Sequence, residues 1–178
     1  LFPGFDLPDI NGLTIDSRNV ERGDIFLPLK GNNFDGHQFI SQAEAAGASL
    51  AFVENPIGTS LSTKQVQSTK SFLYELVRGY RSQLAYPFIG ITGSNGKTTT
   101  KDLLCHVLSD QMNVMRTEGN FNSTTGAPLS LLAFDTDSDI AVIEIGANSP
   151  GEIETICNIV QPNMGLITNI GEAHLAHF

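Results

Sequence analysis

The sequence predicts an α/β protein, with a small mixed α/β domain over residues 1–86 and a parallel-sheet domain over residues 87–178. The first observation is length, because 178 residues correspond to one or two domains at roughly 150 residues each. The second is composition, since 40% apolar and 16% charged residues allow the chain to bury a core. The third is pattern: from Pro87 onward, short apolar runs alternate with apolar residues at helical spacing.

The first domain combines short strands with two helices. Strands are predicted over residues 24–29 and 50–53, and helices over 39–46, ended by Gly47, and 71–84. Residues 55–69 are rich in Gly, Pro, Ser and Thr, which indicates a connection.

The second domain is predicted to contain four strands separated by three helices. The strands span 88–92, 112–117, 140–145 and 164–168, and the helices span 98–110, 128–134 and 153–160. In the first of these helices Leu103, Leu104, Val107 and Leu108 are expected to face inward. In an open parallel sheet, ligands bind beyond the carboxyl ends of the strands. The loops expected to converge there are 93–97, 118–123, 146–149 and 169–174.

Charge and cysteine content exclude several classes of protein. The net charge is −9, whereas a nucleic-acid partner requires a basic face, so we expect no nucleic acid. Residues 117–178 contain eight Asp or Glu and no Lys or Arg. The negative charge of a phosphate ligand there would have to be neutralised by Mg²⁺ or by basic residues in the first half of the chain. No apolar run reaches the ~20 residues of a membrane span. Cys105 and Cys157 indicate reduced thiols and a cytoplasmic location.

The strongest motif runs from Gly90 to Thr99, reading GITGSNGKTT. It follows a strand and opens a helix, which is the setting of a phosphate-binding loop. The predicted phosphate contacts are Gly93, Ser94, Asn95, Gly96, Lys97, Thr98 and Thr99. Lys97 is predicted to reach the β- and γ-phosphates of a nucleotide, and the Thr98 hydroxyl to bind Mg²⁺. Ile91 stands where the standard spacing has a glycine, and the alternative is an ordinary tight glycine turn.

Two further residues end predicted strands on the same edge. Glu144 closes the clearest strand, where a carboxylate either holds Mg²⁺ or is simply solvated. His174 follows the last strand and is either a functional or a structural histidine, since Mg²⁺ prefers oxygen ligands.

Two polar segments remain open in function. Asn120 and Asn122 follow the second strand of the parallel sheet, where their amides either bind a polar substrate or cap a turn. The Asp16-Ser17-Arg18 segment has two interpretations: it either binds a second nucleotide or forms a capped, ion-paired turn. Spacing alone favours the turn.

These segments together resemble the Mur ligases, which form amide bonds in peptidoglycan precursors at the expense of ATP. The resemblance rests on IDSRNVERGDIFLPLKGNNFDGHQFI, ITGSNGKTTTKDLL, TEGNFNSTTGAPLSLL, AVIEIGANSPGEI and TNIGEAHLAHF. The family uses a TGxxGKT loop, which accounts for Ile91. Ser123 stands where a second of two adjacent asparagines is usual.

The resemblance implies a role for each domain. Residues 1–86 would hold the UDP end of a muramyl peptide, through the matching Ser17, Arg18, Asn32, Asn33 and Phe34. The domain from residue 87 would be the first part of a truncated P-loop ATP-binding domain. Lys97, Glu144 and His174 would be its catalytic residues, Thr98, Glu144 and His174 its metal-side residues, and Asn120 and Asn122 its substrate-side residues.

The implied reaction is an ADP-forming ligation. ATP would phosphorylate the carboxylate of UDP-MurNAc-tripeptide, and the amine of D-Ala-D-Ala would then displace phosphate. The alternatives are the family member that adds the third amino acid, diaminopimelate or Lys, and a non-catalytic nucleotide-binding module. The resemblance places the rest of the central domain and a third domain beyond Phe178. We therefore expect residues 1–178 alone to show no ligase turnover. We also expect the protein to be a monomer.

Overall fold

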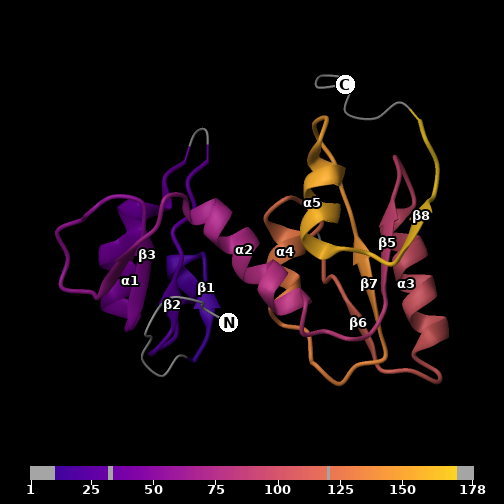
Figure 1. Ribbon diagram of the computed structural model, residues 1–178, viewed down its shortest axis with the longest axis horizontal. Coiled ribbons are helices and arrows are strands. Elements are labelled where there is room, and N and C mark those ends of the chain that lie inside the picture. Colours follow the sequence, from indigo (N-terminus) through magenta and orange to yellow (C-terminus); the bar gives the residue numbers. More distant parts are fainter. Residues whose placement is uncertain (1–10, 32–33, 120, 172–178) are drawn as a thin grey trace. The chain divides into compact units, whose positions relative to one another are not determined.

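The computed structural model describes residues 11–31, 34–119 and 121–171 (Figure 1). The chain divides into two compact units, residues 1–74 and 75–178, and the division falls inside helix α2 (Thr69–Arg81). The predicted boundary between residues 86 and 87 stays a prediction about functional domains.

The first unit contains a four-stranded parallel sheet in the order β1-β2-β3-β4. Its elements are β1 (Leu13–Thr14), η1 (Ser17–Asn19), β2 (Ile25–Phe26), η2 (Gly36–Phe39), α1 (Ile40–Ala46), β3 (Leu50–Val53) and β4 (Thr63–Gln65). The predicted strand 50–53 and the end of α1 at Gly47 are confirmed, since Gly47 takes the left-handed φ of 99° that suits a helix end.

Strand β4 lies within the stretch predicted as a connection, and that prediction was wrong there. Its residues are polar and pair with β3 through Ala51 and Thr63. A strand without apolar alternation gives no periodic signal in the sequence.

The second unit contains a parallel sheet in the order β6-β7-β5-β8, so the predicted fold class is confirmed. Its elements are β5 (Phe88–Thr92), α3 (Lys97–Leu108), β6 (Val114–Arg116), α4 (Gly126–Leu131), β7 (Ile140–Glu144), α5 (Glu152–Val160) and β8 (Met164–Ile167). Figure 1 shows α3 on one side of this sheet and α4 and α5 on the other. The register pairs Ile91 with both Glu144 and Leu166, which brings the carboxyl ends of three strands together.

The inward face of α3 differs from the prediction. Leu103 and Val107 are 62% and 70% exposed, whereas Lys101 and Cys105 are buried. Leu104 and Leu108 do pack against the core around Ile91, Cys105 and Val142. The buried stripe therefore follows positions 101, 104, 105 and 108, and the lysine at its start hid it in the sequence.

Arg81, at the end of α2, is buried within the second unit. Its guanidinium donates to the carbonyls of Val160 and Leu84 at 2.8 Å each, and its Cζ lies 3.7 Å from the centre of the Phe88 ring. Burial lowers the pKa of this guanidinium. The arginine joins the segment before β5 to the end of α5.

Both cysteines are free thiols, as expected, and burial raises the pKa of each. Within the described part of the chain, no helix combines the length and apolar character that crossing a membrane requires.

Candidate active site

The loop between β5 and α3 depends on two glycines with positive φ. Gly93 has a φ of 137° and Gly96, the residue before α3, has a φ of 78°. A Cβ atom at Gly93 would lie 2.2 Å from Thr168 Oγ1, so only glycine fits there. The N–H groups of Lys97, Thr98 and Thr99 open α3, where an α-helix has no acceptor for them and carries partial positive charge.

The same loop is hydrogen-bonded to the segment after β8. The N–H groups of Ser94 and Asn95 donate to Asn169, at 3.1 Å to its carbonyl and 3.0 Å to its side-chain oxygen. Ser94 Oγ and Gly171 exchange two hydrogen bonds of 2.9 Å. The convergence of loops 93–97 and 169–174 is therefore confirmed for residues up to 171.

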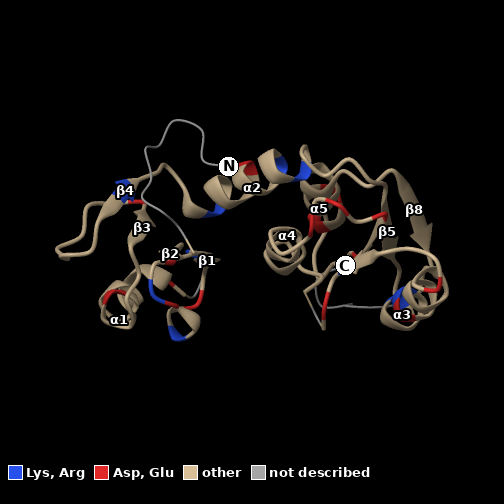
Figure 2. Ribbon diagram, turned by 90° about the horizontal axis from the view of Figure 1, so that it is seen from below, with Lys and Arg blue, Asp and Glu red and all other residues tan. Residues whose placement is uncertain are grey.

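Lys97 lies over the loop that it follows. Its Nζ donates to the carbonyl of Gly93 at 2.7 Å, which keeps the ammonium beside the loop. Lys97 and Lys101 both belong to α3, whereas α5 carries acidic residues and no basic ones (Figure 2). The described part of the chain after Arg116 contains no Lys or Arg, so the positive charge at this edge comes from α3 and from Arg116 at the end of β6.

Glu144 joins the phosphate-loop helix to the loop after β6. Its carboxylate accepts from Thr98 Oγ1 and from Asn122 Nδ2, both at 2.8 Å. Its N–H donates to Thr117 Oγ1 at 2.9 Å. The residue is 2% exposed, so the alternative of a solvated acid at the strand end is wrong.

The donor set at Glu144 suits magnesium. Thr98 and Glu144 offer a hydroxyl and a carboxylate oxygen at one point, and Mg²⁺ in proteins takes oxygen ligands from one or two carboxylates, waters and substrate phosphates. No group of three or more His, Cys, Asp or Glu residues is placed to hold a metal among the described residues. His174 lies outside that part of the chain.

Asn122 is fixed by the backbone as well as by Glu144. Its carbonyl accepts from the N–H of Gly146 at 2.8 Å, and a Cβ atom at Gly146 would lie 3.0 Å from Asn122 Cγ. The neighbouring Ser123 accepts from the N–H of Gly126 at 3.1 Å, which holds the turn that leads into α4. Asn120 lies outside the described residues.

Sequence reasoning missed the support beneath this loop. Lys101, 3% exposed, donates to the carbonyl of Thr117 at 2.9 Å, at the point where the chain leaves β6. The only signal in the sequence is its position, four residues after Lys97 on the same helix.

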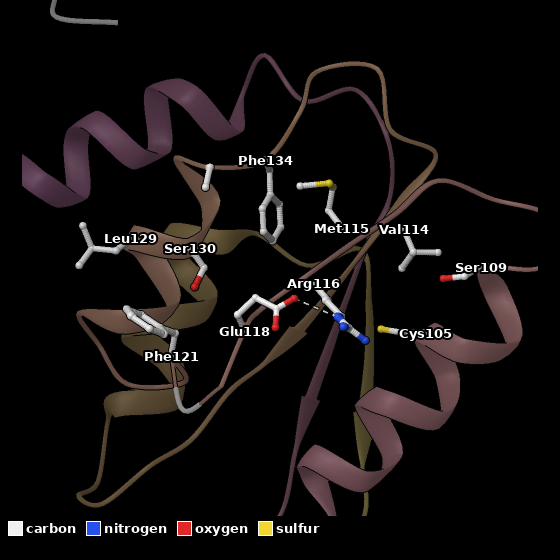
Figure 3. A pocket seen from close by; sticks show the side chains of 11 residues that line it. Cys105, Ser109, Val114, Met115, Arg116, Glu118, Phe121, Leu129, Ser130 and Phe134 are labelled. Carbon is white, nitrogen blue, oxygen red and sulfur yellow. Dashed lines mark hydrogen bonds and ion pairs between the residues drawn. The ribbon is translucent and has the colours of Figure 1, made fainter. Parts of the chain in front are cut away.

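A cavity of about 660 Å³ lies along β6, between α3 and α4 (Figure 3). Its lining is mainly apolar and includes Phe121, Phe134 and Met115. Arg116 Nε and Glu118 Oε1, 3.1 Å apart, form an ion pair on its wall (Figure 3).

The first unit carries a separate candidate site. Asp16 and Arg18 form an exposed ion pair of 2.6 Å, and Asp16 caps η1, so the capped, ion-paired turn is confirmed. The Arg18 side chain lowers the pKa of Asp16 to about 2. Ser17 is buried and donates to Gln42 Oε1 at 2.9 Å.

The turn formed by Asp16, Ser17 and Arg18 also lines a cavity of about 490 Å³. A capped, ion-paired turn does not by itself predict such a cavity. Phe34 lines it too, with its ring stacked on Phe39 at 5.6 Å between centroids. Asn32 and Asn33 lie outside the described residues.

Comparison with known proteins gives the class of protein. Residues 9–81 match the family description "Mur ligase family, catalytic domain", and residues 91–178 match "Mur ligase middle domain". The chain belongs to the Mur ligase family.

Particular relatives define the group within the family. The UDP-N-acetylmuramoyl-tripeptide–D-alanyl-D-alanine ligase of Bacillus subtilis is 41% identical over 177 residues, which cover 97% of this chain and 38% of that protein. The MurF crystal structure from Acinetobacter baumannii superposes with a TM-score of 0.92 at 42% identity, covering 97% of this chain and 39% of that one. MurF from Thermotoga maritima, crystallised with ADP, gives 0.83 at 37% identity, covering 92% and 38%. The chain thus spans less than half the length of these relatives.

Proposed function

We propose that this chain supplies the first two substrate sites of an ATP-dependent, ADP-forming ligase. That ligase joins D-Ala-D-Ala to UDP-MurNAc-tripeptide in peptidoglycan precursor synthesis, in the cytoplasm and as a monomer. Because the chain spans 38% of its Bacillus relative, the activity belongs to a complete ligase that contains it. The observation that carries the proposal is the Thr98–Glu144–Asn122 connection, which joins the phosphate-loop helix to the predicted substrate loop.

The second unit supplies the ATP side, within the proposed domain from residue 87. The N–H groups that open α3 bind phosphate oxygens, and Lys97 offsets negative charge on the transferred phosphoryl group. Thr98 and Glu144, together with His174, form the metal side. Magnesium, when bound, neutralises charge on the phosphates and fixes their orientation. No side-chain nucleophile is required, because the substrate carboxylate and the incoming amine are the reacting groups.

The first unit supplies the UDP side, within the proposed domain 1–86. The Arg18 side chain, 78% exposed at the rim of the cavity, provides a guanidinium for the diphosphate. The exposed ring of Phe34 provides an apolar face for the uracil. Ser17, Asn32 and Asn33 complete the proposed contacts, and the loop that carries Asn120 and Asn122 is proposed to face the tripeptide.

Phosphate release by the complete ligase tests this function. We expect release that requires ATP, UDP-MurNAc-tripeptide and D-Ala-D-Ala together, and none from residues 1–178 alone. Release with UDP-MurNAc-dipeptide and free diaminopimelate or lysine would favour the member that adds the third amino acid. ADP binding without release under any of these conditions would favour a non-catalytic module.

A further inference from the structure

Asn122 stands at the junction between the two substrate sides of the proposed reaction. Its Nδ2 donates to Oε1 of Glu144 at 2.8 Å, while Oε2 of the same carboxylate accepts from Thr98. The two donors come from different elements, the loop after β6 and helix α3. Each oxygen of this buried carboxylate therefore has a donor from its own side of the site.

The backbone of Asn122 is held in place independently of Glu144. The carbonyl of Asn122 accepts from Gly146 at 2.8 Å, and the absence of a side chain at Gly146 gives the amide its room. Because its backbone is bonded to Gly146 and its amide to Glu144, Asn122 connects the loop after β6 to the end of β7. One of the two Nδ2 hydrogens is used in the bond to Glu144, so the amide can turn toward a substrate only by giving up that hydrogen bond.

We propose that Asn122 is a positioning residue, which fixes the orientation of the Glu144 carboxylate toward the magnesium–nucleotide side instead of contacting the tripeptide. This proposal rests on the proposed function. Removing the amide deprives a carboxylate that is 2% exposed of one of its two side-chain donors and frees its rotation. Partners that orient a metal-ligating group typically contribute about 10–100-fold to metal affinity or activity.

The experiment compares Asn122→Ala with Ser123→Ala in the complete ligase. Ser123 belongs to the same loop but bonds Gly126, the first residue of α4, so its variant controls for loop stability. The first readout, which needs no turnover, is the affinity of the enzyme–ADP complex for Mn²⁺, measured by electron paramagnetic resonance. The second is the KM for UDP-MurNAc-tripeptide at saturating MgATP.

We expect Asn122→Ala to weaken Mn²⁺ binding about tenfold or more and to change that KM less than about twofold. In a Glu144→Gln background the same substitution should add little further loss. Asn122→Ser, which keeps a shorter donor, should be intermediate and serves if the alanine variant fails to fold.

A tenfold rise in KM with unchanged Mn²⁺ affinity would overturn the proposal and return Asn122 to direct substrate contact. Equal Mn²⁺ losses in Asn122→Ala and Ser123→Ala would also overturn it, since a disordered loop would then be the cause. Failure of the proposed function is separate, because it would appear as a wild-type ligase that binds Mn²⁺ with ADP but does not join the two substrates.

Discussion

The two candidate sites of this chain are assembled over very different distances along the sequence. In the first unit, Asp16 and Arg18 are two residues apart, and their side chains are 31% and 78% exposed. In the second unit, Glu144 is buried and accepts hydrogen bonds from Thr98 and Asn122, which are 46 and 22 positions away in the sequence. When a hydrogen-bond partner is removed, water can replace it at the exposed Asp16 but not at the buried Glu144. Substitutions should therefore affect the second site far more than the first.

The largest effect is expected at the phosphate loop. Lys97→Ala in the complete ligase should reduce turnover by about 10²-fold or more, as removal of a group that stabilises transition-state charge does. Phosphate release at saturating substrates measures this, with thermal unfolding as the control for folding. A variant with more than a tenth of wild-type turnover would show that the loop does not act on the phosphoryl group.

A smaller loss is expected when the long-range contacts of Arg81 are removed. Arg81→Ala deprives buried carbonyls, including that of Val160, of their donor, and should lower the free energy of unfolding by about 2 kcal/mol. Arg78 is exposed on the same helix, so Arg78→Ala is the matched control. Urea unfolding compares the two, and equal changes would mean that the buried contacts of Arg81 contribute little, since alanine is itself a good helix former.

Tyr86 should make the second unit sensitive to alkali. Burial raises its pKa from 10.0 to about 12, and its hydroxyl donates to the carbonyl of Asp135 at 2.7 Å. The stability from the neutral phenol is complete below pH 10 and is lost as pH rises through about 12. Tyr86→Phe should therefore cost about 1 kcal/mol at pH 8 and less at pH 11.5. A constant difference across that range would contradict this assignment.

The smallest effect is expected in the first unit. The ion pair with Arg18 lowers the pKa of Asp16 to about 2, so its contribution is complete above the ordinary value of 3.8 and is lost as pH falls through 2. Asp16→Asn should produce a slight drop in Tm at pH 6 that disappears near pH 2 and in 1 M salt. A large drop at pH 6 would mean that the two sites do not differ as described.

The same contrast explains what sequence reasoning could predict. The strand and helix that flank the glycine loop before Lys97 and Thr98 could be predicted because these elements follow one another in the sequence, and the strand that Glu144 ends because it is apolar. The roles of the three residues stay predictions. The partners of Asn169 and Asn122 were not predicted, since they depend on the strand order β6-β7-β5-β8, which hydrophobic alternation does not specify. Lys101 was missed because a buried charge looks like an interruption of an apolar stripe.

The hydrogen bonds between the phosphate loop and the segment after β8 also set an order of events during synthesis. Ser94 and Gly171 are 77 residues apart, so the ribosome requires roughly 4–15 s between them at about 5–20 residues per second. During that interval loop 93–97 has been synthesised, but its hydrogen bonds to Thr168, Asn169 and Gly171 cannot yet form. A nascent chain should therefore complete the proposed nucleotide site only after β8 has emerged, when the sheet that supports the loop exists.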